Sequence, residues 1–187
     1  MSWLRPPGPV APGLHIGLLG GSFNPAHRGH LYVAEVAIKR LHLDYVWLLV
    51  APQNPLKPAA DMLPLIRRVE LARALAGRRP RLVVSDLEQG LASRYTIDTI
   101  RALICRFPGV DFFWLMGSDN LEQFHRWRRW QDIAACLPIA VVLRPGSTLA
   151  PLKAKAMQRF GARIIVVDGR RNESSATALR ACGITKG

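Results

Sequence analysis

Six short apolar runs alternate along this chain with segments of helical pattern, and this alternation constrains the fold more than any other feature of the sequence. The runs are rich in β-branched and aromatic residues, as is typical of strands that are covered on both faces. They span residues 15–21, 45–51, 81–86, 111–117, 139–144 and 162–168. The helical patterns span residues 29–41, 64–77, 95–106, 121–135, 150–160 and 176–182. The alternation predicts an α/β fold, a Rossmann-like doubly wound parallel sheet in a three-layer α/β/α arrangement.

The length of 187 residues fits one domain with a hydrophobic core of its own. We expect this domain to span residues 14–187. Residues 1–13 contain four prolines and lack the apolar stretch of a secretory signal, so we expect them to form a poorly ordered extension. No apolar run in the chain approaches the roughly 20 residues that a membrane helix needs.

The three cysteines, Cys105, Cys136 and Cys182, are widely separated and show no spacing typical of zinc ligands. An odd number of cysteines without a disulfide framework indicates reduced thiols. Together with the lack of a membrane helix and of a secretory signal, this predicts a cytoplasmic protein with no membrane partner. The sequence leaves open whether the chain forms a homo-oligomer.

The formal net charge of +13 has two interpretations. It is typical of proteins that bind nucleic acids, and it also fits a basic surface that attracts small anionic substrates. The Lys and Arg residues are scattered along the chain, and no recognisable nucleic-acid-binding module accompanies them. We therefore favour small anionic substrates over a nucleic-acid partner.

Residues 20–30, GGSFNPAHRGH, connect the first predicted strand to the first predicted helix. Gly20 and Gly21 permit a turn whose main-chain N–H groups approach a phosphate, and the following helix presents its N-terminus to the same anion. His27 and His30 are three residues apart and therefore share one helix face. The run matches neither the P-loop pattern nor the dinucleotide-binding pattern of glycines. It indicates chemistry on a nucleotide phosphate.

This run resembles the HxGH signature of the nucleotidyltransferase superfamily, and its full form is most similar to that of bacterial nicotinate-nucleotide adenylyltransferases. Enzymes of the superfamily transfer a nucleotidyl group from a nucleoside triphosphate and release pyrophosphate. The resemblance implies that His27 and His30 are catalytic. It also places Asn24, where the family often has Asp, in the acceptor site. The contacts to ATP phosphates that it implies are Gly20, Gly21, Ser22 and Phe23.

Residues 173–180, ESSATALR, form a second candidate anion site. Hydroxyl groups that can cap a helix stand at its start, and Arg180 follows one turn later. An ordinary capped helix explains the segment equally well. The segment resembles the family's SSTxIR motif, which contacts the ATP phosphates, and Ser175, Thr177 and Arg180 match that motif. Ala176 replaces its second serine.

Two further segments resemble motifs of the same family. Residues 51–57, APQNPLK, resemble its PxxxPxHK loop, with Leu56 in place of the usual His. Lys57 is then a phosphate contact, and a solvated loop lysine is the alternative. Residues 93–100, SRYTIDTI, resemble the SYTxDTL motif, in which the residue that matches Thr96 helps to hold the pyridine carboxylate. A role of Thr96 in capping a helix is compatible with this assignment.

Residues 114–127, WLMGSDNLEQFHRW, resemble the family's G-x-D-x-L…F…W stretch. The match places Asp119 in the nucleotide site and stacks Trp127 on the nicotinate ring. Arg144, at the end of the fifth predicted strand, is a further candidate for a contact to the acceptor phosphate. The resemblance runs from residue 20 to residue 180, which is most of the chain.

The resemblance implies adenylyl transfer from ATP to nicotinate mononucleotide, which gives deamido-NAD and pyrophosphate in NAD biosynthesis. The acceptor phosphate is largely ionised at neutral pH because its second pKa is about 6, so direct in-line attack needs no protein nucleophile. Cations and N–H donors aimed at the transition state are sufficient. Mg²⁺ is the expected cofactor, carried by the ATP phosphates rather than by ligands from the protein.

Two other functions remain open from the sequence. A pantetheine-phosphate adenylyltransferase also carries an HxGH motif, although the segments around Thr96 and Trp127 favour a nicotinate acceptor. A non-catalytic basic RNA-binding protein on the same fold would explain the net charge of +13 and the departures at Asn24, Leu56 and Ala176.

Overall fold

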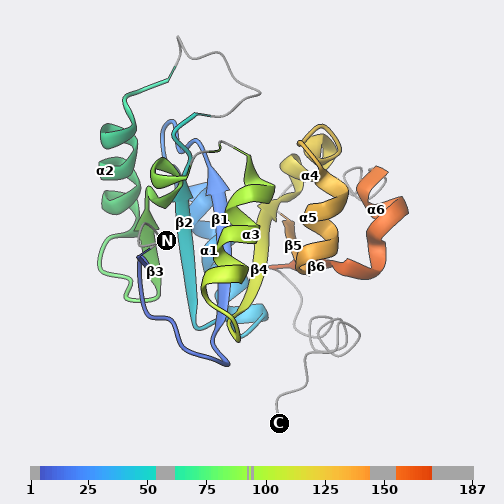
Figure 1. Ribbon diagram of the computed structural model, residues 1–187. Coiled ribbons are helices and arrows are strands. Elements are labelled where there is room, and N and C mark those ends of the chain that lie inside the picture. Colours follow the sequence, from blue (N-terminus) through green and yellow to red (C-terminus); the bar gives the residue numbers. More distant parts are fainter. Residues whose placement is uncertain (1–4, 54–61, 92, 94, 144–154, 170–187) are drawn as a thin grey trace.

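The computed structural model describes residues 5–53, 62–91, 93, 95–143 and 155–169, and these form a twisted sheet with helices on both faces (Figure 1). All five strand pairs are parallel, and the strand order is β3-β2-β1-β4-β5-β6. This confirms the predicted doubly wound, Rossmann-like α/β fold. The strands are β1 (His15–Gly21), β2 (Tyr45–Val50), β3 (Leu82–Ser85), β4 (Asp111–Gly117), β5 (Ile139–Leu143) and β6 (Ile164–Asp168).

The helices divide between the two faces of the sheet, and each face has its own buried apolar cluster. One cluster joins the sheet to α1 and α2, and the other joins it to α3, α4, α5 and α6. In Figure 1, α3 lies in front of the sheet and α1 lies behind it. The predicted three-layer arrangement is therefore present. The helices are α1 (Arg28–Arg40), α2 (Leu65–Ala76), α3 (Thr96–Arg106), α4 (Ser118–Phe124), α5 (Trp130–Cys136) and α6 (Lys155–Phe160), with 3₁₀ turns η2 (Leu87–Gly90) and η4 (Gly161–Arg163).

The order of the strands creates a crevice at the carboxyl ends of β1 and β4. From β1 the chain crosses to β2 on one side, whereas β4 continues to β5 on the other side. The loops that follow β1 and β4 therefore diverge at the carboxyl edge of the sheet, which is where doubly wound folds bind their ligands. The position of the predicted loop 20–30 at this edge follows directly from the topology.

The predicted single helix over residues 121–135 is wrong. The structure has two short helices there, and Arg129 between them has a φ of 52°, which interrupts a right-handed helix. The apolar spacing predicted one helix because Leu121, Phe124 and Ile133 all pack into the same apolar cluster, so this spacing continues across the break. The break places Trp127 in a turn at the mouth of the crevice rather than on a helix face.

Residues 5–13, part of the segment that we expected to be poorly ordered, contact the domain at several points. Val10 packs against the buried cluster on the α3 face, and the N–H of Gly13 donates to the carbonyl of Gly109 at 2.7 Å. Within the described ranges, no helix is both long and apolar enough to cross a membrane.

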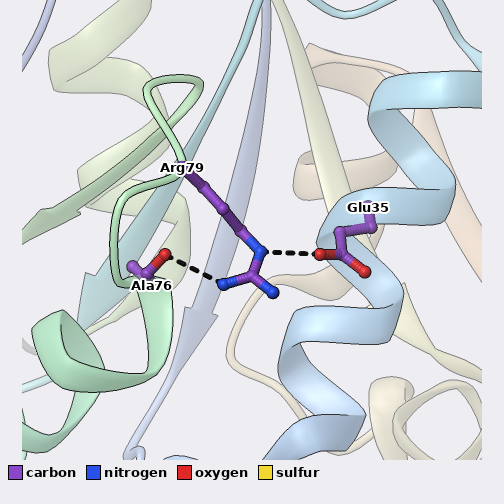
Figure 2. A network of polar contacts seen from close by, with 3 residues as sticks. All are labelled: Glu35, Ala76 and Arg79. Carbon is purple, nitrogen blue, oxygen red and sulfur yellow. Dashed lines mark hydrogen bonds and ion pairs between the residues drawn. The ribbon is translucent and has the colours of Figure 1, made fainter.

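A polar contact joins the two helices that share the α1 face (Figure 2). Arg79 follows α2, and its guanidinium donates from Nε to Oε1 of Glu35 on α1 at 2.7 Å and from Nη1 to the carbonyl of Ala76 at 3.2 Å. Both charged side chains are about half exposed, so the ion pair contributes about 0–1 kcal/mol. Apolar packing, rather than this pair, holds α1 and α2 against the sheet.

Gly20 leaves the space that the Trp114 ring fills. A Cβ atom at Gly20 would lie 2.9 Å from Cζ2 of Trp114 and closer still to Cη2. We therefore expect Gly20→Ala to lower the free energy of unfolding by about 1–3 kcal/mol, because the rigid ring must move within a packed core. The measurement is urea unfolding followed by circular dichroism.

Gly161→Ala is the matched control, because a Cβ atom there meets nothing within 4 Å. We expect it to leave the free energy of unfolding within about 0.5 kcal/mol of the original. Equal stability of the Gly20→Ala protein and the original protein would contradict the close contact with Trp114.

Candidate functional site

A cavity of about 530 Å³ opens at the carboxyl ends of β1 and β4. This volume suits a nucleotide-sized ligand. The position is the one that the strand order predicts. Ten residues that the sequence singled out line it: Gly20, Gly21, Ser22, Phe23, Asn24, His27, His30, Thr96, Asp119 and Trp127.

The two histidines are held by the first turn of α1. His27 is the N-cap residue, and its Nδ1 accepts a hydrogen bond from the N–H of Gly29 at 3.1 Å. The Nδ1 of His30 accepts from the N–H of His27 at 3.2 Å, which completes a reciprocal capping arrangement. The ring centroids lie 3.9 Å apart. The N-terminus of α1 thus sets the position of both rings.

These caps also fix where the proton of each imidazole lies. A ring nitrogen that accepts a hydrogen bond from a backbone N–H carries no proton itself, so each neutral ring holds its proton on Nε2. His27 and His30 both line the cavity, and each therefore has an Nε2–H donor that is not used in the cap. Two adjacent N–H donors at a helix N-terminus form a favourable place for a phosphate oxygen.

The loop between β1 and α1 is tied to the start of α2. Phe23 is buried and has a φ of 47°, an unusual conformation for a residue with a large side chain. Its ring packs on His30, with centroids 4.6 Å apart. Asn24 follows, and its Oδ1 accepts from the N–H of Leu63 at 3.0 Å. An aspartate at this position could accept the same bond, so the difference from the family pattern preserves this contact.

Aromatic side chains form the wall near β4. Trp127 makes edge contacts with Trp114 on β4 and with Phe124 on α4, at centroid distances of 6.0 and 5.4 Å. Trp114 and Trp127 both line the cavity. A half-buried indole with its edges fixed by neighbouring rings is suited to stacking on a flat aromatic ligand.

Arginine and tyrosine extend this wall toward α3. The guanidinium of Arg128 lies 4.5 Å from the centre of the Tyr95 ring, a cation–π contact. Tyr95 is the N-cap residue of α3, and Thr96 is its first helical residue. Arg126 also lines the cavity. The wall therefore combines flat rings with positive charge, which suits an anionic aromatic group.

Glu88, which the sequence did not single out, also lines the cavity. Its side chain is 8% exposed, and its Oε1 accepts from Oγ1 of Thr99 at 2.9 Å. Burial raises the pKa of Glu88, and the hydrogen bond from Thr99 opposes part of that shift. No sequence signal marks Glu88, because it lies in the short 3₁₀ turn η2 after β3.

Several predicted site residues lie outside the described residues: Lys57, Arg144, Ser175, Thr177 and Arg180. Their predicted roles stay predictions. Within the described ranges, no group of three or more His, Cys, Asp or Glu side chains is arranged to hold a metal ion.

Comparisons with known proteins give a consistent result. The cytidylyltransferase-like family model matches residues 18–182. A relative from Methylorubrum extorquens (strain PA1) is 48% identical over 184 residues, which cover 89% of this chain and 99% of the relative. A relative from Parvibaculum lavamentivorans is 56% identical over 140 residues, covering 75% of this chain and 69% of the relative. Both relatives carry the name "Probable nicotinate-nucleotide adenylyltransferase".

Solved structures agree with the fold. The Plasmodium falciparum nicotinic acid mononucleotide adenylyltransferase complexed with NaAD superposes with a TM-score of 0.70 at 16% sequence identity. The match covers 89% of this chain and 83% of the other chain. At this identity, the likeness establishes the shared architecture.

The raised pKa of Glu88 makes a prediction for stability. Between the ordinary pKa of 4.5 and its folded-state pKa, the folded protein binds more protons than the unfolded chain. Stability therefore falls as the pH rises through this window. Glu88→Gln keeps an acceptor for Thr99 and does not ionise. We expect its gain in unfolding free energy over the original protein to be smallest below pH 4.5 and to grow with rising pH, each pKa unit corresponding to about 1.4 kcal/mol.

The measurement is urea unfolding of both proteins from about pH 4 to about pH 8. Glu122→Gln, an exposed position on α4, is the control and is expected to show no growing difference. A Glu88→Gln difference that stays constant over the whole range would contradict the raised pKa.

Proposed function

Because this chain belongs to the nicotinate-nucleotide adenylyltransferases, within the cytidylyltransferase-like family, we propose that it transfers an adenylyl group from ATP to nicotinate mononucleotide. The products are deamido-NAD and pyrophosphate, and the reaction belongs to NAD biosynthesis. The observation that carries the proposal is the cavity itself. His27, His30 and Trp127 all line it, so candidate phosphate donors and an aromatic wall belong to one site.

The reaction depends more on alignment of the two substrates than on activation of the nucleophile. The phosphate of the acceptor is largely ionised at neutral pH, since its second pKa is about 6, so it attacks the α-phosphorus of ATP directly. A bond forms between an acceptor phosphate oxygen and the α-phosphorus, and the bond to the pyrophosphate oxygen breaks. Charge that develops on the phosphoryl oxygens is stabilised by N–H donors. The Nε2–H groups of His27 and His30 and the backbone of residues 20–23 supply such donors.

The opposite end of the cavity fits the acceptor. In this proposal Trp127 stacks on the pyridine ring, and Thr96, which lines the cavity at the start of α3, holds the ring carboxylate. Asn24 and Asp119 also line the cavity, and we assign them to the ribose and phosphate of the acceptor. The positive charge of Arg128 over Tyr95 complements the negative charge of the substrate.

Residues outside the described ranges complete the proposed site. Lys57, Ser175, Thr177 and Arg180 contact the ATP phosphates, and Arg144 contacts the acceptor phosphate. Mg²⁺ prefers oxygen ligands and keeps several waters, so the triphosphate oxygens suffice to carry it. When bound there, Mg²⁺ neutralises part of the charge on the triphosphate.

We also propose where and in what form the protein acts. Cys105 and Cys136 are free thiols, which fits a reducing cytoplasm. Residues 14–187 act as one domain, to which residues 1–13 are an extension. The anionic substrates make a nucleic-acid partner unnecessary as an explanation of the net charge of +13.

An acceptor panel tests the proposed reaction. We expect pyrophosphate release from ATP with nicotinate mononucleotide, and deamido-NAD as the product in mass spectrometry. Nicotinamide mononucleotide and phosphopantetheine belong on the panel as competing acceptors. Turnover with phosphopantetheine alone would identify the other adenylyltransferase. Salt-dependent RNA binding without any turnover would favour the non-catalytic function.

His30→Ala tests the role of the paired donors. Loss of an N–H donor that stabilises transition-state charge lowers kcat by about 10²–10³-fold. We expect such a loss in pyrophosphate release under saturating substrates, with the circular dichroism spectrum unchanged. His42→Ala, which alters an exposed histidine in the turn after α1, is the control and is expected to keep full activity. Full turnover of a folded His30→Ala protein would contradict the mechanism.

A further inference from the structure

Arg68 on α2 is a buried arginine that connects three separate segments, two of which contribute residues to the cavity lining. Only 1% of its surface is exposed. Its Nη1 donates to the carbonyl oxygens of Ser22 and Ala51 at 2.6 and 2.7 Å. Its Nη2 donates to the carbonyl of Pro52 at 2.7 Å, and its Nε donates to that of Leu63 at 2.9 Å. One rigid guanidinium therefore joins the loop after β1, the loop after β2 and the segment before α2.

The charge of Arg68 is compensated by backbone carbonyls alone among the described residues. No carboxylate lies within ion-pair distance of it in that part of the chain. Burial also lowers the pKa of the Arg68 guanidinium. A buried cation without a counter-charge is a costly way to stabilise a fold, since apolar side chains of similar volume usually do so at least as well. The free-energy cost of burying this charge indicates that Arg68 has a role in positioning the backbone groups that it binds.

The bond to Ser22 fixes the orientation of one particular peptide group. The carbonyl of Ser22 and the N–H of Phe23 belong to the same planar trans peptide, so they point in opposite directions. With the carbonyl directed at Arg68, the N–H of Phe23 points away from the guanidinium. Within the described ranges, this N–H donates to no protein acceptor. Both residues line the cavity.

Without contacts from other residues, the Ser22–Phe23 peptide would relax out of this orientation. The φ of Phe23 is 47°, in the left-handed region that large side chains disfavour. The buried Phe23 ring and the Arg68–Ser22 bond are the contacts that oppose relaxation of this backbone. A rotation of the peptide would change the direction of the N–H donor.

We propose that Arg68 is a positioning residue for nucleotide binding: it holds the Ser22–Phe23 peptide so that the N–H of Phe23 binds a phosphate oxygen of ATP. The proposal rests on the proposed function only in taking ATP as the anion. The same guanidinium fixes Ala51 and Pro52, and Gln53, the next residue, also lines the cavity. Arg68 thus sets two loops of the site against each other without touching the ligand.

The test uses protein labelled with ¹⁵N-phenylalanine, which gives one amide resonance for each of the six Phe residues. The resonance of Phe23 is assigned by its loss in Phe23→Tyr. Titration with ATP is followed by NMR for Phe23 and by calorimetry for the Kd. We expect the Phe23 amide of the original protein to shift on binding. Arg68→Met is expected to lose this response and to raise the Kd for ATP by about tenfold or more.

Arg68→Lys and Arg67→Met complete the set. A lysine ammonium keeps the charge but cannot reach all four carbonyls in the planar geometry of a guanidinium, so we expect a measurably higher Kd for ATP. Arg67 is the adjacent exposed arginine of α2, paired with Glu70, and Arg67→Met is expected to bind ATP as the original protein does. If Arg68→Met fails to fold, the comparison of Arg68→Lys with Arg67→Met decides.

Each outcome separates this proposal from the proposed function. A Phe23 amide of the original protein that does not respond to ATP overturns the positioning role, even if adenylyl transfer is observed. A folded Arg68→Met or Arg68→Lys protein with an unchanged Kd and a lowered Tm shows a purely structural role and also overturns it. The original protein could bind ATP with a Phe23 shift yet transfer no adenylyl group to nicotinate mononucleotide. Loss of that shift in Arg68→Met would then support the positioning role, and only the proposed reaction would fail.

Discussion

The pairing of β1 with β4 is the constraint on which the rest of the structure depends. These strands lie side by side although the chain visits β2 and β3 between them. Their loops must leave in opposite directions, and α1 and α4 both begin at this edge with their N-termini near the same space. The close fit of Trp114 over Gly20 shows how tightly the two strands are matched there. The cavity is therefore a consequence of the sheet order, and its polarity is a consequence of the helix N-termini.

In the proposed reaction, the polar groups around the cavity orient the substrates and do not activate a nucleophile. His27 and His30 use one nitrogen each to cap α1 and keep the other as a donor. Arg68 holds backbone carbonyls of the loops beside the cavity, and Arg128 adds positive charge at the Tyr95 ring. A reaction whose nucleophile is already ionised needs this kind of site, in which donors are fixed before the ligand arrives.

Much of the fold and of the site could be predicted from local sequence. Apolar runs covered on both faces identify strands, and the glycine-rich turn that carries His27 and His30 lies at the cavity as predicted. The break before α5 could not be predicted, because both short helices pack into one cluster and the apolar spacing continues across the turn that contains Arg129. Glu88 and Arg68 could not be identified from the sequence for another reason. Their importance comes from burial against distant segments, which no local pattern records. Lys57 and Arg180 lie outside the described residues, and their roles remain predictions.

A crystal structure of the protein with bound deamido-NAD tests the central claim most directly. The account predicts that the product lies in the cavity between β1 and β4. Its diphosphate would contact the backbone of residues 20–23 and the Nε2 atoms of His27 and His30, and its pyridine ring would lie on Trp127. Product bound at another place on the sheet, or with its diphosphate away from the two histidines, would contradict the account.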